Sequence, residues 1–149
     1  MRDEHCHLIW GVDDGSESRE MTLQMVEAAR SCGFTEVVCT PHMRWDDFDR
    51  AAVERRFAEL SELAPDIAWT LGFEVFYKRL AHLGFEHARE FTLGESDAIL
   101  IEFDTGGSVP DDWERAFYRL QTEQALDIVS RQTGMEWSKL DNVYFVTKR

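Results

Sequence analysis

Short apolar runs alternate with helical periodicity in the first third of the chain. The run from His5 to Trp10 breaks at a glycine and an acidic turn, which predicts a strand followed by a loop. Ser16 or Ser18 can cap the helix that follows. The residues expected to face the core recur at helical spacing until a glycine ends this helix, and they are Met21, Met25, Ala28, Ala29 and Cys32. A second, buried strand is predicted from Glu36 to Thr40, where a proline stops it.

The same alternation continues along the rest of the chain. Asp49 opens a second helix that ends before a proline, and a third strand follows from Ile67 to Leu71. The segment after it has no clear pattern. A fourth strand spans Ala98 to Phe103, between turn residues. A long helix from about Asp111 to Thr133 and a last strand from Asn142 to Thr147 complete the prediction.

This order of elements predicts an α/β fold with a mainly parallel sheet and right-handed crossovers. We expect residues 1–149 to form one domain whose sheet is either open or curled into part of a barrel. In folds of this kind the chemistry gathers at the carboxyl ends of the strands.

The charge of the chain narrows the classes of partner. Twenty-nine acidic and sixteen basic residues give a formal net charge of -13, which repels nucleic acid and anionic membrane surfaces. Solubility alone explains such an excess, but carboxylates gathered in one pocket would also attract divalent cations. No apolar run approaches the roughly 20 residues of a membrane span, and the first residues lack the plan of a signal peptide, so a cytoplasmic location is expected.

The three cysteines form no CxxC pair and suggest neither a disulfide framework nor a thiolate zinc site. We interpret Cys32 and Cys39 as small core residues. Cys6 is expected to point away from the histidines on either side of it.

Ligand-type side chains occur at the predicted strand ends. Two histidines two residues apart on a strand leave it on the same face and can bind one metal ion. His42 follows the second predicted strand, Glu74 follows the third, and Glu102 lies at the end of the fourth. Asp13 and Asp14 lie in the loop after the first strand. The predicted metal ligands are His5, His7, Asp14, His42, Glu74 and Glu102.

Each of these residues also has a simple structural explanation, such as a turn at Asp14 or a solvated histidine pair at His5 and His7. Buried carboxylates at strand ends are nevertheless costly unless they are paired or bind metal, which favours a shared metal centre. Imidazole and carboxylate ligands without thiolate suit zinc, manganese or iron. Hydrolysis of a phosphoester is the natural reaction of such a centre, while amide hydrolysis and deamination stay open.

The opening Asp-Glu-His-Cys-His-Leu-Ile-Trp-Gly-Val-Asp-Asp-Gly-Ser and the later Cys-Thr-Pro-His, Leu-Gly-Phe-Glu-Val and Ala-Ile-Leu-Ile-Glu-Phe carry a family resemblance. Together they closely resemble the tyrosine phosphatases of the polymerase-and-histidinol-phosphatase (PHP) superfamily that occur in capsule and exopolysaccharide operons. The resemblance covers roughly residues 1–121. It implies a distorted, TIM-like (β/α) barrel and up to three divalent metal ions, with a bridging hydroxide that attacks the phosphate of phosphotyrosine.

The resemblance also implies roles for the ligands. His5, His7 and Glu74 would bind one metal, Glu74 would bridge to a second that Glu102 also holds, and Asp14 and His42 would hold the third. Asp14, His42 and Glu74 are the residues that we expect to serve catalysis. A phosphotyrosine protein is the implied substrate, with a bacterial tyrosine kinase as the candidate.

The sequence departs from the family pattern after the fourth strand. The His-Pro-Glu-Arg and Asp-x-His motifs of the family are missing, and residues 122–149 diverge. Each metal would therefore lose a ligand, and the phosphate-binding arginine would be lost. Recruitment of His82 or His87 as substitute ligands is an open alternative, and Arg44 could meet a phosphate.

Three hypotheses follow for the function. The first is a metal-dependent tyrosine phosphatase, working with a reduced metal site or completed by another chain. The second is a catalytically impaired remnant of a truncated PHP domain that binds a kinase or forms a homo-oligomer, because an open half-barrel exposes a sheet edge. The third is the product of a frameshifted gene.

Overall fold

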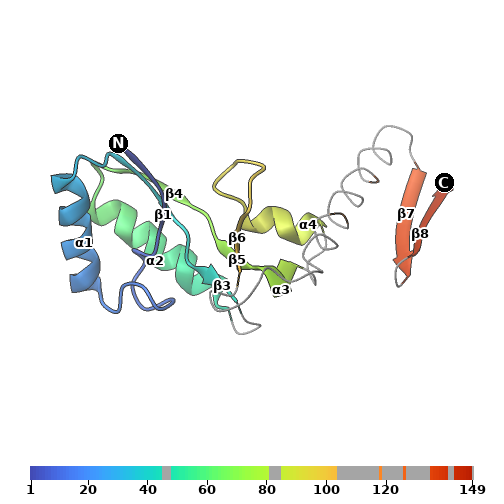
Figure 1. Ribbon diagram of the computed structural model, residues 1–149, viewed down its shortest axis with the longest axis horizontal. Coiled ribbons are helices and arrows are strands. Elements are labelled where there is room, and N and C mark those ends of the chain that lie inside the picture. Colours follow the sequence, from blue (N-terminus) through green and yellow to red (C-terminus); the bar gives the residue numbers. More distant parts are fainter. Residues whose placement is uncertain are drawn as a thin grey trace.

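A computed structural model gives the structure of the chain. It describes residues 1–44, 48–80, 85–103, 118, 126, 135–140 and 143–148. Its strands are β1 (Arg2–Cys6), β2 (Glu36–Cys39), β3 (His42–Met43), β4 (Ala68–Leu71), β5 (Glu74–Phe76), β6 (Leu100–Glu102), β7 (Met135–Leu140) and β8 (Val143–Lys148). Its helices are α1 (Arg19–Ser31), α2 (Arg50–Leu63), α3 (Tyr77–Leu80), α4 (Phe85–Ala88) and the 3-10 turn η1 (Arg89–Phe91), and Figure 1 shows their arrangement.

Two parallel sheets form the body of the fold. One has the strand order β1-β2-β4 and the other the order β3-β5-β6, and every pairing within them is parallel. The predicted α/β fold with a mainly parallel sheet is confirmed. Among the described strands the sheets do not close into a barrel.

A bend joins the two sheets. The chain passes from β2 to β3 through Thr40 and Pro41, and from β4 to β5 through Gly72 and Phe73. Backbone hydrogen bonds continue across both breaks, since Gly72 N donates to Cys39 O at 2.8 Å and Glu74 N donates to Pro41 O at 3.1 Å. The bend therefore keeps the strands in register while it changes their direction.

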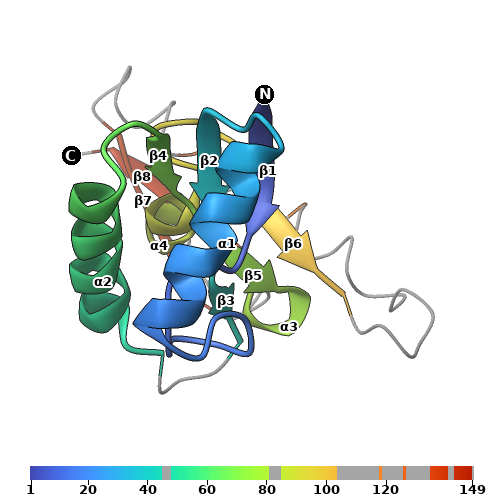
Figure 2. The ribbon, with the colours of Figure 1, turned by 90° about the vertical axis from the view of Figure 1, so that its left-hand side faces the viewer.

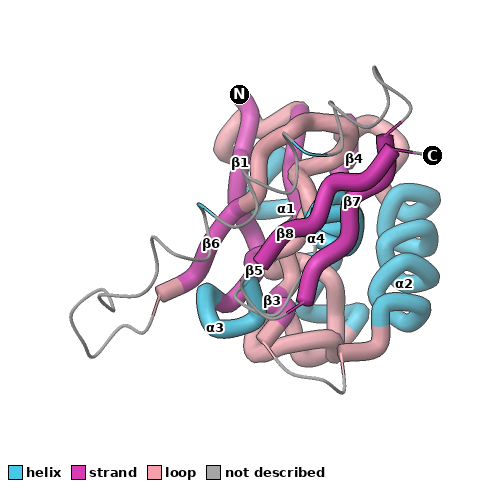
Figure 3. Tube along the Cα trace, turned by 90° about the vertical axis from the view of Figure 1, so that its right-hand side faces the viewer, coloured by secondary structure: helices cyan, strands magenta, loops and turns pink. Residues whose placement is uncertain are grey.

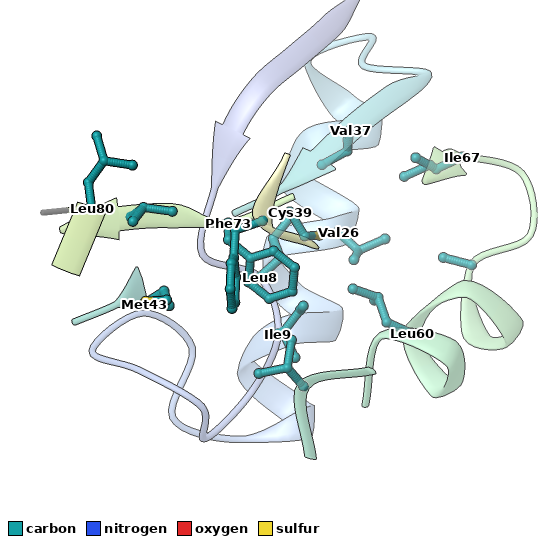
Figure 4. Packing of buried hydrophobic residues seen from close by; sticks show 14 residues of the cluster. Leu8, Ile9, Val26, Val37, Cys39, Met43, Leu60, Ile67, Phe73 and Leu80 are labelled. Atoms are coloured by element: carbon teal, nitrogen blue, oxygen red, sulfur yellow. The ribbon is translucent and has the colours of Figure 1, made fainter. Parts of the chain in front are cut away.

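Side chains from α1 and α2 pack with β2 to form the core. Figure 2 shows α1 lying across β1 and β2. Val26 of α1 and Leu60 of α2 are fully buried and belong to one cluster with Val37 and Cys39 of β2, as Figure 4 shows. Burial of a valine or leucine side chain stabilises a fold by about 1.5–3 kcal/mol, so this cluster fixes the helices against the sheet.

The first strand lies earlier than predicted. It was expected from His5 to Trp10, but β1 ends at Cys6. The backbone leaves the sheet at His7, whose carbonyl accepts a hydrogen bond from Ser16 N at 3.1 Å. Leu8 and Ile9 are buried nonetheless, at 3% and 1% exposure. Their apolar character thus reflects a buried loop rather than a strand.

The core-facing side of α1 also differs from the prediction. Ser18 caps the helix, while Ser16 is buried and bonds to Thr22 Oγ1, which in turn donates to Leu8 O at 2.8 Å. These contacts turn Thr22 inward and leave Met21 exposed at 41%. Cys32, expected in the core, is exposed, whereas Cys39 is buried as predicted.

The other predicted elements have mixed outcomes. Strands β2, β4 and β6 and helix α2 are confirmed within one or two residues at each end. The last strand is confirmed as β8, but it pairs antiparallel with β7, which was not predicted (Figure 3). The long helix expected from Asp111 to Thr133 lies outside the described residues except for Tyr118 and Leu126. No helix in the described ranges has the length and apolar character to cross a membrane.

Candidate metal centre

The bend between the sheets gathers the predicted ligands. His42 begins β3 and Glu74 begins β5, and these two residues are partners in the parallel ladder. Glu102 ends β6, one strand further along the same sheet. His5 lies in β1, and His7 and Asp14 lie in the loop that follows it. All six predicted ligands therefore meet at one place.

Their ligand atoms form three overlapping groups. Within each group the atoms lie within 4.8 Å of one another, and the groups are His5, His7 and Glu74; His7, Asp14 and His42; and His42, Glu74 and Glu102. Glu74 Oε2 lies 3.4 Å from His7 Nε2 and 2.8 Å from His42 Nδ1. Glu102 Oε2 is 3.2 Å from the same His42 Nδ1, and Asp14 Oδ1 is 3.1 Å from His42 Nε2. Each pair of groups thus shares one residue, and the shared residues are His7, His42 and Glu74.

These spacings fit a divalent ion. Ligand atoms about 2.0–2.2 Å from one ion at angles near 90–110° are roughly 3–3.5 Å apart, and the four distances given above, from 2.8 to 3.4 Å, are close to this spacing. His42 Nδ1 and Glu74 Oε2 are both buried, and although they are close, neither makes a hydrogen bond among the described residues. A buried carboxylate oxygen without a hydrogen bond costs about 1–3 kcal/mol, and an ion bound at Glu74 Oε2 would satisfy it.

Asp13 is a functional residue that the sequence analysis did not assign to the site. Its side chain is only 4% exposed and accepts three hydrogen bonds. His7 Nδ1 lies 2.8 Å from Oδ2, His42 N donates to Oδ2 at 3.1 Å, and Gly15 N donates to Oδ1 at 3.0 Å. A carboxylate on one ring nitrogen orients a histidine so that the other nitrogen faces the metal. Asp13 therefore directs His7 Nε2 toward Glu74.

The pair of His7 and Asp13 has shifted proton affinities. The hydrogen bond to Asp13 raises the pKa of His7, against the opposing effect of burial. Burial alone would raise the pKa of Asp13, but hydrogen bonds from His7, Gly15 and His42 outweigh it, so the pKa of Asp13 is lowered. The two side chains thus form a hydrogen-bonded ion pair when His7 is protonated.

Replacing Asp13 with asparagine is expected to destabilise the protein, in the presence of a chelator, by about 2 kcal/mol near pH 5. The lowered pKa of Asp13 gives stability that is present above its ordinary value of 3.8 and lost as the pH falls through the lowered value. The raised pKa of His7 gives stability that is present below its ordinary value of 6.5 and lost as the pH rises through the raised value. Urea unfolding of the wild type and of Asp13→Asn, at pH values below 3.8, between 3.8 and 6.5, and above 6.5, measures the difference in their free energy of unfolding. A difference that does not vary with pH would contradict the ion pair.

His5 has an orienting partner of its own. Its Nδ1 lies 2.6 Å from the hydroxyl of Thr40, a fully buried residue at the bend. The hydroxyl of Thr40 lies 3.4 Å from Cys6 O, to which it can donate while accepting from His5. This leaves His5 Nε2, 3.9 Å from Glu74 Oε1, with a lone pair for an ion.

The cysteines stay out of the centre. Cys6 Sγ lies 3.4 Å from Val38 O, so it points away from the histidines as predicted. The contact with Cys6 and burial raise the pKa of Cys39 well above its ordinary value, which keeps that thiol protonated.

Of the two histidines considered as substitutes, His82 lies outside the described residues. His87 is exposed beside Glu90 and belongs to none of the three ligand groups. No described residue outside the predicted set joins these groups.

The parallel α/β fold, with imidazole and carboxylate side chains at the bend of its sheets, defines a class of α/β protein whose candidate metal ligands lie at strand ends. Within that class, the chain belongs to the capsular polysaccharide synthesis CpsB/CapC family, whose model matches residues 1–129. The resemblance noted in the sequence is thereby confirmed.

Individual relatives agree with this family. The tyrosine-protein phosphatase CpsB of Streptococcus pneumoniae is 31% identical over 109 residues, which cover 69% of this chain and 45% of that protein. The putative tyrosine-protein phosphatase CapC of Staphylococcus aureus is 26% identical over 138 residues, which cover 87% of this chain and 53% of that protein. The chain thus spans about half the length of the curated relatives it matches.

A solved structure shares the fold as well. It comes from work on YwqE from Bacillus subtilis and CpsB from Streptococcus pneumoniae, described as metal-dependent tyrosine phosphatases. The similarity has a TM-score of 0.66 at 27% sequence identity and covers 83% of this chain and 52% of that one.

Proposed function

We propose that this chain is a metal-dependent protein-tyrosine phosphatase that serves capsular polysaccharide biosynthesis. The observation that carries the proposal is the joint position of His42 and Glu74, which link three ligand groups at the bend of the sheets. The family supports the reaction, since relatives of this chain are named as tyrosine phosphatases that depend on metal.

The described residues provide up to three ion sites. His5, His7 and Glu74 would hold one ion, Glu74 and Glu102 a second, and Asp14 and His42 a third, and each of these sets lies within one of the three ligand groups. Manganese, zinc or iron suits this mixture of nitrogen and oxygen ligands. Such ions supply a water of lowered pKa and neutralise charge on a phosphoryl group.

The protein's own residues orient the ligands and admit the substrate. Asp13 and Thr40 hold the rings of His7 and His5, so both present Nε2 to Glu74. Asp14 is the most exposed ligand, with 68% of its side chain accessible, while the side chains of His42 and Glu74 are 12% and 13% exposed. The substrate would therefore approach from the side of Asp14.

A phosphotyrosine protein, with a bacterial tyrosine kinase as the candidate, is the proposed substrate. The net charge of -13 disfavours nucleic acid as an alternative phosphoester. We further propose that the chain works in the cytoplasm and acts as one domain.

The purified chain, loaded with manganese, is expected to hydrolyse p-nitrophenyl phosphate, and a chelator should abolish the activity. Changing His5 to alanine should lower the turnover at least about 100-fold. Loss of a residue that only orients a metal ligand already costs about 10–100-fold, and this change removes a ligand itself. Changing His87 to alanine is the matched control, since this exposed histidine lies outside the ligand groups, and it should leave turnover unchanged. Equal turnover of the wild type and His5→Ala would refute the phosphatase function.

Elemental analysis separates the phosphatase from a catalytically impaired interaction module. Two or three equivalents of transition metal per chain are expected for the enzyme, in line with the three ligand groups. Metal near zero, together with oligomers in light scattering, would favour the interaction module, because the described sheets leave edge strands unpaired.

A further inference from the structure

A cavity of about 480 Å³ opens beside the metal centre. It lies between the loop after β1 and the first turns of α2, and its walls include Val12, Asp14, His42, Arg44, Phe48 and Arg56. Its volume is in the range of small-ligand sites. One part of the wall is ligand atoms and guanidinium groups, and another part is apolar, so the cavity can receive a molecule with an anionic end and an apolar body.

Phe48 is a fixed part of the apolar wall. Its ring packs edge-on against Phe73 at 5.7 Å and against Phe91 at 6.2 Å between ring centroids. Aromatic pairs in this geometry stabilise one another by about 0.5–1.5 kcal/mol beyond their burial. The ring is therefore held in place before any ligand arrives.

The two guanidinium groups of the cavity have different partners. Arg56 Nη1 donates to the carbonyls of Trp10 at 2.9 Å and Gly11 at 2.6 Å, so it braces the loop backbone. The partners of Arg44 are instead predicted metal ligands. Arg44 Nε donates to Glu102 Oε2 at 2.7 Å, and its Nη2 contacts the other carboxylate oxygen.

Arg44 reaches two more ligands. Its Nη2 lies 2.8 Å from His42 Nε2, and its Nη1 lies 3.4 Å from Asp14 Oδ2. The hydrogen bond with Glu102 is the main cause of the raised pKa of Arg44, so this side chain keeps its positive charge. His42 Nε2 and Glu102 Oε2 are ligand atoms of the proposed ion sites.

An ion and Arg44 cannot use these atoms together. A lone pair on His42 Nε2 can meet either the guanidinium or a metal, and the two cations repel each other at contact distance. Binding of an ion therefore frees Arg44, whereas Arg56 keeps its carbonyl partners. Guanidinium groups form paired hydrogen bonds with phosphate oxygens, so a freed Arg44 matches the anionic end of a phosphate ester.

We propose that metal binding displaces Arg44 from Glu102 and His42 and thereby turns the cavity into a binding site for aryl phosphate monoesters. Arg44 then holds the phosphoryl group at the edge of the metal centre, and the aryl group lies against Val12 and Phe48. The proposal rests on the function proposed above. It makes Arg44 a substrate-binding residue and a competitor of the metal.

Titration calorimetry with phenylphosphonate, an analogue of phenyl phosphate without a hydrolysable ester bond, tests the proposal on the full chain. The manganese-loaded wild type should bind phenylphosphonate, and the chelator-treated protein should bind it at least about 10-fold more weakly. Arg44→Met should weaken the binding of phenylphosphonate by about 10–100-fold, which corresponds to the loss of a paired charged hydrogen bond. The same change should leave manganese affinity equal or raise it several-fold. Arg44→Lys keeps the charge but loses the paired donors of the guanidinium group, so its affinity should lie between those of the wild type and Arg44→Met.

Arg55→Met is the matched control, because it makes the same change at another arginine. Arg55 lies in α2 next to Arg56 but lines no part of the cavity. It should change neither affinity. Phe48→Ala should weaken the binding of phenylphosphonate more than the binding of inorganic phosphate. Weaker manganese binding in Arg44→Met, or unchanged binding of phenylphosphonate, would overturn the proposal.

These outcomes also separate the inference from the function on which it rests. If binding of the aryl ligand depends on Arg44 but no turnover is found, the phosphatase function is wrong and the binding site is supported. If the wild type and Arg44→Met turn over substrate with the same KM, the phosphatase function is supported and the role of Arg44 in substrate binding is wrong.

Discussion

Replacing Glu74 with glutamine is expected to remove metal from two of the three ligand groups at once. Glu74 belongs to the groups that contain His5 and His7 and that contain His42 and Glu102. An amide keeps the size of the side chain but loses the charge, and its nitrogen cannot bind an ion. We expect the metal affinity at both sites to fall by at least about 100-fold, more than the loss of a ligand's partner produces. The proposed phosphatase activity should fall with the metal affinity.

Elemental analysis after gel filtration measures the bound metal. Glu59→Gln is the control, because Glu59 is an exposed glutamate of α2 outside the ligand groups. If the Glu74 variant kept the metal content of the wild type, the shared centre would be wrong. Its folding should be intact, because an amide oxygen of the same shape can take the place of Glu74 Oε2 in its close contacts with His7 and His42.

Replacing Gly15 with alanine is expected to cause the largest loss of stability. A Cβ atom at Gly15 would overlap His7 Cβ and lie 2.5 Å from His7 O. The backbone at His7 cannot yield easily, because its carbonyl already accepts from Ser16 N. We expect a destabilisation of about 3 kcal/mol, the upper range for overpacking. In a chain of this size, that corresponds to a fall in Tm of roughly 10 °C.

The same change should displace His7 and weaken manganese binding, which links the loop to the centre. Gly33→Ala is the contrasting control. Gly33 has a φ of +82°, and within the described part of the chain no atom outside its chain neighbours lies within 4 Å of the position that an alanine Cβ would take. The change therefore costs only backbone strain of about 1 kcal/mol. Thermal unfolding and calorimetry should show metal binding unchanged in Gly33→Ala. Equal effects of the two substitutions would contradict the tight contact at Gly15.

The ligand set could be predicted because strand ends in a parallel sheet meet at one edge. His42, Glu74 and Glu102 each stand where an apolar run stops, and this simple rule was enough to group them. Asp13 could not be assigned in the same way, because it follows no apolar strand directly and an aspartate just before Asp14 and Gly15 equally describes a turn. Its three hydrogen bonds come from His7, Gly15 and His42, and the last of these is 29 residues away.

Other features depend on tertiary contacts that no local pattern reveals. Leu8 and Ile9 look like strand residues, but a hydrogen bond from Ser16 to His7 closes a loop around them. The inward face of α1 follows from the bond of Thr22 to Leu8 O, which shifts the buried side by one residue from the apolar stripe. Likewise, the pairing of Arg44 with Glu102 joins residues 58 positions apart.

The bend at Thr40–Pro41 and Gly72–Phe73 has a consequence for how the protein tolerates change. His42 and Glu74 are neighbours in one hydrogen-bonded ladder, so peptide groups set the spacing of their backbones at roughly 4.8 Å. Repacking of α1 or α2 would carry both residues along as a unit rather than pull them apart. The two helices can therefore drift in sequence and position while the spacing of His42 and Glu74 stays constant.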